Sequence, residues 1–342
     1  KEIKIYPDIQ ADGINLVVTV TEKENSKQLL KDKGVIPLSE MEKIDKSLTI
    51  KDISISGLNY LTQDKIKELV PLTVGGYFSK TKALEGKNNL LNSGYFYSVE
   101  PAATKYEDGV YLVYNVVENM YINGIEFKGN TLYTNEQIKE KMKSKEKNIF
   151  NYNELREDKN IIDKLYKDGG YGLGQVYDVQ IDPQTQNVIF YISEGVVKDI
   201  VFRKVNKREN DERRSEEKSD LKTEDFVLQR EIVLEKGKPL ETAKFEKTAR
   251  NLFRLGIFKN VTQEFESVPD DPNSKIVVFL LDEQKTAAYQ GTVSYGASSG
   301  LAGSLSVSDT NFKGNGQSLS LTGTVGESST KSLSLSFSDP WI

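Results

Sequence analysis

The stretch Phe-Arg-Leu-Gly-Ile-Phe at residues 253–258 decides the fold, because it reads as a helix that ends on a glycine and passes at once into a strand. Two related stretches precede it, Leu-Leu-Asn-Ser-Gly-Tyr-Phe at 90–96 and Tyr-Lys-Asp-Gly-Gly-Tyr-Gly at 166–172. Their glycines lie 76 and 86 residues apart, at Gly94, Gly170 and Gly256. A recurrence of that length predicts small domains repeated in tandem and is too long for the turns of a solenoid.

Around each glycine the hydrophobic pattern predicts one module of the order β-α-α-β-β. Its clearest helix start is Thr134 followed three residues later by Gln137, which together predict a capping box. The second module departs from the others at one position, because Gly172 stands where they have Phe96 and Phe258. We therefore expect the hairpin of the second module to pack differently where it begins.

The predicted organisation has six parts. Residues 1–24 read as the C-terminal hairpin of an incomplete module, turning at Asp12-Gly13, and residues 25–47 read as a linker with one proline. Three complete modules follow, at 48–119, 120–195 and 196–286, the third interrupted by a charged, solvated insertion at 204–220. The last part is 287–342.

This last part is rich in Ser, Gly and Thr, and it alternates as strictly as Ser-Leu-Ser-Leu at 318–321. Turn residues divide it into four segments of about ten residues, which is the length and period of transmembrane β-barrel strands. An ordinary antiparallel sheet with one solvated face has the same period. The pattern by itself leaves both interpretations open.

Composition excludes several kinds of chemistry. The 342 residues include neither Cys nor His, so disulfides, thiol nucleophiles, imidazole-based triads and the usual zinc ligand sets are ruled out. The formal net charge of -5 disfavours nucleic acid as a partner. The glycine-rich run 169–174 superficially resembles a nucleotide-binding loop, but it precedes a strand and opens no helix. We expect no catalytic residues, no metal and no cofactor.

Several stretches together resemble a known family. The run Phe-Arg-Leu-Gly-Ile-Phe-Lys-Asn-Val at 253–261 is similar to POTRA (polypeptide-transport-associated) domains. The runs Asn-Phe-Lys-Gly-Asn-Gly at 311–316 and Ser-Asp-Pro-Trp at 338–341 resemble the opening barrel strands of outer-membrane β-barrel assembly factors, the BamA-like proteins of Gram-negative bacteria. The fold implied is α+β: tandem POTRA modules followed by the N-terminal strands of a transmembrane β-barrel. A barrel of that family has about sixteen strands, of which this sequence holds about four.

The resemblance implies a function and partners. Periplasmic modules would receive unfolded outer-membrane β-barrel proteins, and the barrel would insert them into the outer membrane without a cofactor. Periplasmic chaperones, accessory assembly lipoproteins and outer-membrane lipid are the other partners implied. Alternatives are the pore of a two-partner secretion or autotransporter-assembly system and, in a different class, a soluble repeat-domain scaffold or adhesin.

Candidate binding residues follow from sheet edges. A three-stranded sheet with two helices on one face leaves an unpaired edge, expected here at the first hairpin strand of each module, where a client strand can add through main-chain hydrogen bonds. The expected client-binding positions are Ser98, Val99, Val176, Tyr177, Val179, Val261, Thr262 and Gln263. The family implies a weak barrel seam at the first barrel strand, represented by Tyr289, Val293 and Tyr295.

Overall fold

The computed structural model describes residues 2–10, 13–21, 34–107, 109–205, 221–297, 300–327 and 331–341. They fold into two compact units, one made of 1–165 with 175–192 and the other of 166–174 with 193–342. The predicted N-terminal hairpin is present, since β1 (Glu2–Gln10) pairs antiparallel with β2 (Gly13–Thr21). Most of the predicted charged insertion, residues 206–220, lies outside the described residues.

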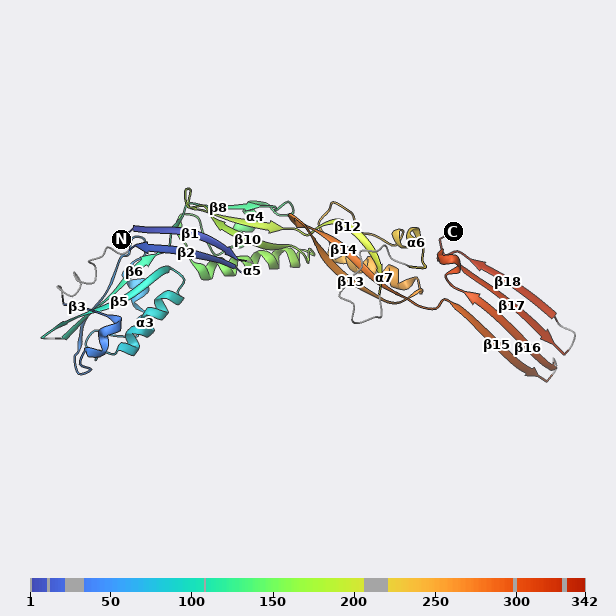
Figure 1. Cartoon of the computed structure of the whole chain (residues 1–342), viewed down its shortest axis with the longest axis horizontal. Helices are drawn as coiled ribbons and strands as arrows, with labels where there is room; N and C mark the ends of the chain where they lie inside the picture. Colours follow the sequence, from blue (N-terminus) through green and yellow to red (C-terminus); the bar gives the residue numbers. More distant parts are fainter. Residues whose placement is uncertain are drawn as a thin grey trace. The chain divides into compact units, whose positions relative to one another are not determined.

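The first module has the predicted order β-α-α-β-β (Figure 1). Its elements are β4 (Ile50–Ser56), α2 (Gln63–Lys67), α3 (Lys80–Asn92), β5 (Phe96–Tyr106) and β6 (Gly109–Glu118). The first strand pairs parallel with the last, and the last pairs antiparallel with β5. Ser79 caps α3 by accepting a hydrogen bond from the N–H of Lys82. Apolar residues of both helices and the sheet form one core, including the fully buried Ile50, Leu90, Leu112 and Tyr114.

Residues 34–47 correct the expectation of a linker at 25–47, whereas residues 25–33 lie outside the described residues. Here β3 (Val35–Pro37) and a 3-10 helix, η1 (Leu38–Lys43), belong to the module, and β3 pairs antiparallel with β5. Met41 and Ile44 are buried in the core, and Ile36 and Leu38 pack against it. The sheet order is therefore β3-β5-β6-β4. Burial of these scattered apolar side chains stabilises a segment whose composition alone reads as polar and irregular.

The second module repeats the arrangement. Its elements are β7 (Tyr121–Ile122), β8 (Gly124–Lys128), α4 (Asn135–Lys141), β9 (Asn148–Ile149), α5 (Tyr152–Asp168), β10 (Gln175–Ile181) and β11 (Asn187–Ser193). The sheet order is β10-β11-β8, with the two-residue strands β7 and β9 paired separately. The predicted capping box of Thr134 and Gln137 is confirmed, because both of its hydrogen bonds form at the start of α4.

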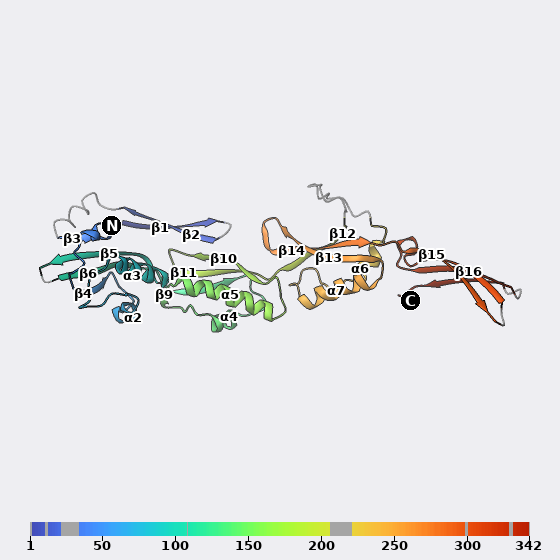
Figure 2. The same ribbon diagram turned by 90° about the horizontal axis from the view of Figure 1, so that it is seen from below.

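The third module has the sheet order β12-β14-β13. Its elements are β12 (Val196–Lys204), α6 (Asp225–Gln229), α7 (Thr242–Arg254), β13 (Phe258–Val268) and β14 (Asp271–Glu283). The helices lie together on one side of this sheet (Figure 2). Leu228, Leu252, Val277 and Phe279 are among the residues buried between helices and sheet.

Four antiparallel strands follow, joined in chain order as β15-β16-β17-β18. They are β15 (Ala287–Gly296), β16 (Gly300–Asp309), β17 (Ser318–Gly326) and β18 (Lys331–Ser338), with a short 3-10 turn η2 (Phe312–Gly314) between the second and third. The pairing confirms the four predicted segments. Within the part of the chain that the structure describes, every helix is too short or too polar to span a membrane.

Candidate strand-binding edges

Among the described residues, the third module presents β13 as an edge strand of eleven residues with no further strand beside it. Successive residues of a strand point their backbone groups to opposite sides, so one hydrogen bond fixes the pattern. The N–H of Val205 donates to the carbonyl oxygen of Leu281, which shows that Leu281 faces β12. Leu280 therefore faces β13, and its register partner Thr262 faces back toward it. The backbone groups of Val261, Gln263 and Phe265 then point outward, away from the sheet.

The three predicted client-binding positions on β13 differ in the direction of their backbone groups. The backbone groups of Val261 and Gln263 point away from the sheet, whereas the N–H and C=O of Thr262 belong to the ladder with β14. The N–H of Val261 is bonded locally, to the side chain of Asn260. Gln263 is thus the predicted position whose donor and acceptor both face an incoming strand.

An aromatic wall lies beside the edge of β13. Phe265 is 41% exposed, and its ring centroid lies 5.2 Å from that of Phe245 on α7. Phe245 in turn lies 5.9 Å from the buried Phe279 of β14. Because Val261, Gln263 and Phe265 alternate along the strand, their side chains share the face that carries α7. An extended chain added here would meet apolar surface on that face.

The edge strand of the second module is β10, where the backbone N–H of Val176 already has a hydrogen-bond acceptor within the module. Val176 donates its N–H to Asp163 Oδ1 of α5 at 2.7 Å. Burial raises the pKa of the Asp163 carboxyl above its ordinary value. The side chains of Val176 and Val179 lie in the core, whereas Tyr177 is 43% exposed, with its ring near that of Tyr191.

In the first module the expectation of an unpaired edge on the first hairpin strand is wrong at residues 102–104, where β3 pairs with β5. The N–H of Val110 donates to the carbonyl oxygen of Thr49, so Val110 faces β4 and Tyr111 faces β5. By the same alternation Val99, Pro101 and Ala103 face outward, whereas Ser98 pairs with Val117 inside the hairpin. β3 covers Ala102 to Thr104, and Pro101 has no N–H to offer. Of the two residues predicted there, only Val99 has outward backbone groups.

The glycine that ends each second helix has positive φ, as a C′ residue requires: 83° at Gly94, 88° at Gly170 and 68° at Gly256. In two modules its carbonyl oxygen also accepts a bond from the next module's second helix. Tyr152 donates its N–H to Gly94 at 3.1 Å, and Thr242 donates its N–H to Gly170 at 2.8 Å. The glycine phrase therefore marks the joint between consecutive modules as well as the end of a helix.

The joint after α3 is reinforced by asparagines. Asn151 and Asn153 donate side-chain N–H groups to the carbonyl oxygens of Ser93 and Asn92. These carbonyls lie at the C-terminal end of α3, where a helix leaves its acceptors without helical partners. Buried Asn119 donates to Gly94 and Phe150 as well. Asn151 and Asn153 of the second module, together with Asn119 at the end of the first, thus satisfy carbonyl groups at the end of α3.

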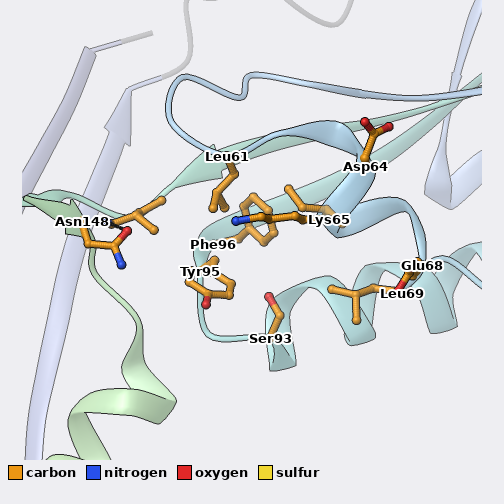
Figure 3. A pocket seen from close by; sticks show the side chains of 11 residues that line it. Leu61, Asp64, Lys65, Glu68, Leu69, Ser93, Tyr95, Phe96 and Asn148 are labelled. Carbon is orange, nitrogen blue, oxygen red and sulfur yellow. Dashed lines mark hydrogen bonds between the residues drawn. The ribbon is translucent and has the colours of Figure 1, made fainter. Parts of the chain in front are cut away.

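A hollow of about 610 Å³ lies beside this joint (Figure 3). Its apolar lining includes Leu61, Leu69, Tyr95 and Phe96, and its polar lining includes Asp64, Lys65, Glu68 and Asn148. Burial is the main reason for a raised pKa at Tyr95, whose hydroxyl donates to Glu154. The described residues contain no cluster of three Asp or Glu side chains fit to hold a metal ion.

The four-stranded sheet exposes one apolar face. Tyr289, Val293 and Tyr295 of β15 are 77–79% exposed and share that face by their two-residue spacing. Across the sheet the face continues through register pairs such as Tyr289 with Val307, Val307 with Leu321 and Leu321 with Leu335. Most positions on the other face are Ser or Thr, with Ala288, Gln290 and Ala302 among the exceptions, and β15 is an edge strand of this sheet. An apolar face beside a small polar face suits a strand between lipid and lumen.

Sequence reasoning missed two features that decide which edges are open. One is β3, whose three residues carry no periodicity long enough to read. The other is the direction in which each edge residue points its backbone groups. Pro101 was a usable signal, because proline within a strand predicts an edge position whose missing N–H faces away from the sheet.

Comparisons with known proteins agree with this architecture. The POTRA family (surface antigen variable number repeat) matches residues 48–119, 120–195 and 217–284. A putative outer membrane protein assembly factor of Treponema pallidum is 22% identical over 99% of this chain and 40% of its own length. The outer membrane protein assembly factor BamA of Nitratidesulfovibrio vulgaris is 26% identical over 72% of this chain and 33% of its own length.

Among solved structures, the N-terminal domain of Omp85 from Thermosynechococcus elongatus superposes with a TM-score of 0.56 at 24% identity, covering 70% of this chain and 98% of that one. This likeness shows the fold. The chain covers well under half the length of the two curated relatives. The first two matches span the first two modules, and the third covers the part of the third module from residue 217 to residue 284. Since the family matches more than half of the chain, the chain belongs to the POTRA family, and it is similar to the BamA-like outer-membrane assembly factors.

Proposed function

We propose that this chain is the periplasmic part and the first barrel strands of an outer-membrane protein assembly factor, which receives unfolded β-barrel proteins by strand addition and passes them to its barrel. Its POTRA repeats and its similarity to proteins named as outer-membrane assembly factors support this function. No enzymatic step and no cofactor are part of the proposal. The modules would lie in the periplasm and the strands β15–β18 in the outer membrane.

The single observation that carries client binding is the open edge of β13. Outward backbone groups recur at Val261, Gln263 and Phe265, and an aromatic wall flanks them on the helix side. Main-chain hydrogen bonds depend little on the sequence of the client. A client with apolar residues at every second position would place them in contact with Phe245 and Phe265. Barrel strands have that alternation. The β10 edge is a second site, with Tyr177 exposed beside it.

The four C-terminal strands support the membrane half of the proposal. Their exposed residues Tyr289, Val293, Leu333 and Leu335 are apolar over a continuous face, which in water would be an aggregation hazard. In a bilayer the same face would be solvated by lipid, with the small polar residues toward the lumen. β15 would form one side of the seam. Chaperones and accessory lipoproteins are further partners in this proposal.

The test uses a peptide with the sequence of residues 331–338 as a model barrel strand. The full chain carries benzoylphenylalanine in place of Phe265, and cross-linking to the peptide is measured with and without Gln263→Pro. The proline removes an outward donor and places its ring at the edge, so cross-linking should fall by about fivefold or more. Gln263→Ala, which keeps the backbone N–H, is the matched control and should cross-link like the parent. Equal cross-linking of all three would refute strand addition at β13.

The complete gene can be expressed in cells depleted of their own assembly factor. Restored insertion of barrel proteins would identify an assembly factor and would argue against a secretion pore. Dependence of the chain on detergent or lipid would separate both from a soluble scaffold or adhesin.

A further inference from the structure

The edge of the first module is already occupied by a strand of the same chain. β3 lies antiparallel to β5, with Ile36 opposite Ala103. Because Ala103 points its backbone groups away from β6, these two residues form a hydrogen-bonded pair that exchanges both N–H···O bonds. This is the geometry that an added client strand would adopt, here supplied by residues 35–37.

The occupying strand is anchored beyond its own pairing. The side chain of Met41 is 1% exposed and that of Ile44 is 4% exposed, and both contribute to the core beneath the sheet. Lys80 at the start of α3 pairs with Glu42 at 2.5 Å. A segment held at one end by buried apolar residues can pair over three residues, although so short a strand would not stay paired alone.

Two prolines limit how far the pairing extends. Pro37 ends β3, and Pro101 on β5 lacks the next outward donor. The sites in the second and third modules differ, since β10 and β13 have no further strand beside them among the described residues. One module is thus closed at the position where the other two are open.

We infer that β3 is the resident occupant of a strand-binding edge in the first module: it closes this edge to incoming chains, and its release opens a site for an extended apolar segment. The inference rests on the proposed function only for the identity of the incoming chain. The closed edge directs client strands to β10 and β13, and it keeps the Ala103 edge from pairing with other copies of the chain.

The experiment measures amide hydrogen exchange at Ala103 in the full chain. Ile36→Pro removes the N–H that donates to the carbonyl oxygen of Ala103 and so weakens the pairing of β3 with β5. The N–H of Ala103, which donates to residue 36 in the paired state, should then exchange about tenfold faster or more. Val35→Ala is the matched control, because it trims a neighbouring side chain and keeps that bond. A peptide with the sequence of residues 33–40, added to Ile36→Pro in excess, should restore slow exchange. Slow exchange at Leu112 verifies that the module is folded, and Ile36→Gly is the second variant if the proline unfolds it.

Slow exchange at Ala103 in the folded variants, or failure of the peptide to restore it, would overturn the inference. A further arm adds the barrel-strand peptide 331–338 to the parent chain. Protection at Gln263 without any change at Ala103 is expected, whereas direct capture of the peptide at Ala103 in the parent would mean that β3 does not close the edge. If the barrel-strand peptide protects neither residue, the proposed client site fails while the 33–40 peptide still decides the role of β3.

Discussion

The N–H of Gly172 donates to Oγ1 of Thr242 at 3.1 Å, which explains why the second module has glycine where the others have phenylalanine. A Cβ added to Gly172 would lie 3.0 Å from that hydroxyl oxygen. Thr242, the first residue of α7, therefore limits the space for a side chain at position 172. The expected difference in the second hairpin is thus a consequence of the joint with the third module.

Gly172→Phe should destabilise the chain, because a ring at this position would displace Thr242 from the end of α5. Overpacking of this kind costs about 1–3 kcal/mol. The free energy of unfolding is measured by urea denaturation, with Gly172→Ala as the smaller step. Stability equal to the parent in Gly172→Phe would show that the joint has room for the aromatic residue and that Thr242 does not exclude it.

Gly94→Ala and Gly256→Ala form a matched pair. Both glycines have positive φ, so each substitution places alanine in the left-handed conformation at a cost of about 1 kcal/mol. At Gly94 the new Cβ would also lie 2.4 Å from Asn151 Oδ1, whereas nothing lies within 4 Å of the position at Gly256. We expect Gly94→Ala to lose about 1–2 kcal/mol more than Gly256→Ala in thermal unfolding. Equal losses would mean that the asparagine joint adds no constraint.

Thr262→Pro and Gln263→Pro should differ in stability although the residues are adjacent. Thr262 pairs with Leu280 in the ladder, so its proline variant leaves the carbonyl oxygen of Leu280 without its donor, at a cost of about 1–3 kcal/mol. Gln263 faces outward, and its variant should stay within about 1 kcal/mol of the parent. Hydrogen exchange of Leu280 and Val278 reports the effect locally. The reverse order would overturn the assignment of outward residues on β13.

Asn311→Ala should weaken the contact between the third module and the turn that joins β16 to β17. Asn311 is 2% exposed, donates from Nδ2 to Thr223 Oγ1 at 3.0 Å and accepts the N–H of Gly316 at Oδ1. Loss of both bonds from a buried site costs about 1–3 kcal/mol. Faster exchange at Glu224, whose N–H donates to Gly314, is the readout. Asn311→Asp, which retains the acceptor, should lie between parent and alanine variant.

The raised pKa of the Asp163 carboxyl predicts that the stability of the chain depends on pH. Burial raises the pKa of its carboxyl above the ordinary value of 3.8, so the folded state binds the proton more tightly than the unfolded state does. Its favourable contribution is complete below pH 3.8 and is lost as pH rises through the folded-state pKa. Relative to Asp163→Asn, the parent should therefore lose stability on going from about pH 3.5 to neutrality. A difference that does not change over this range would contradict the raised pKa.

Local signals in the sequence accounted for the repeated modules. Gly94, Gly170 and Gly256 end helices because the left-handed C′ conformation strongly favours glycine. Thr134 and Gln137 begin a helix through bonds that span three residues, and strict alternation predicted the four C-terminal strands. All of these depend on neighbours along the chain, which is why one sequence sufficed to predict them.

Tertiary structure alone decided which edges are open. Ile36 pairs with a residue 67 positions away, and Val261 and Thr262 differ only in the side to which a neighbouring strand fixes their backbone groups. Neither this pairing nor the direction of these backbone groups can be recognised from neighbouring residues in the sequence, because both depend on main-chain hydrogen-bonding groups that nearly every residue carries. The sequence by itself therefore determined what each module is made of and where its helices end. The packing of distant segments determined that the first edge is closed, that β13 is open, and that Gly94 and Gly170 also join their modules to the next.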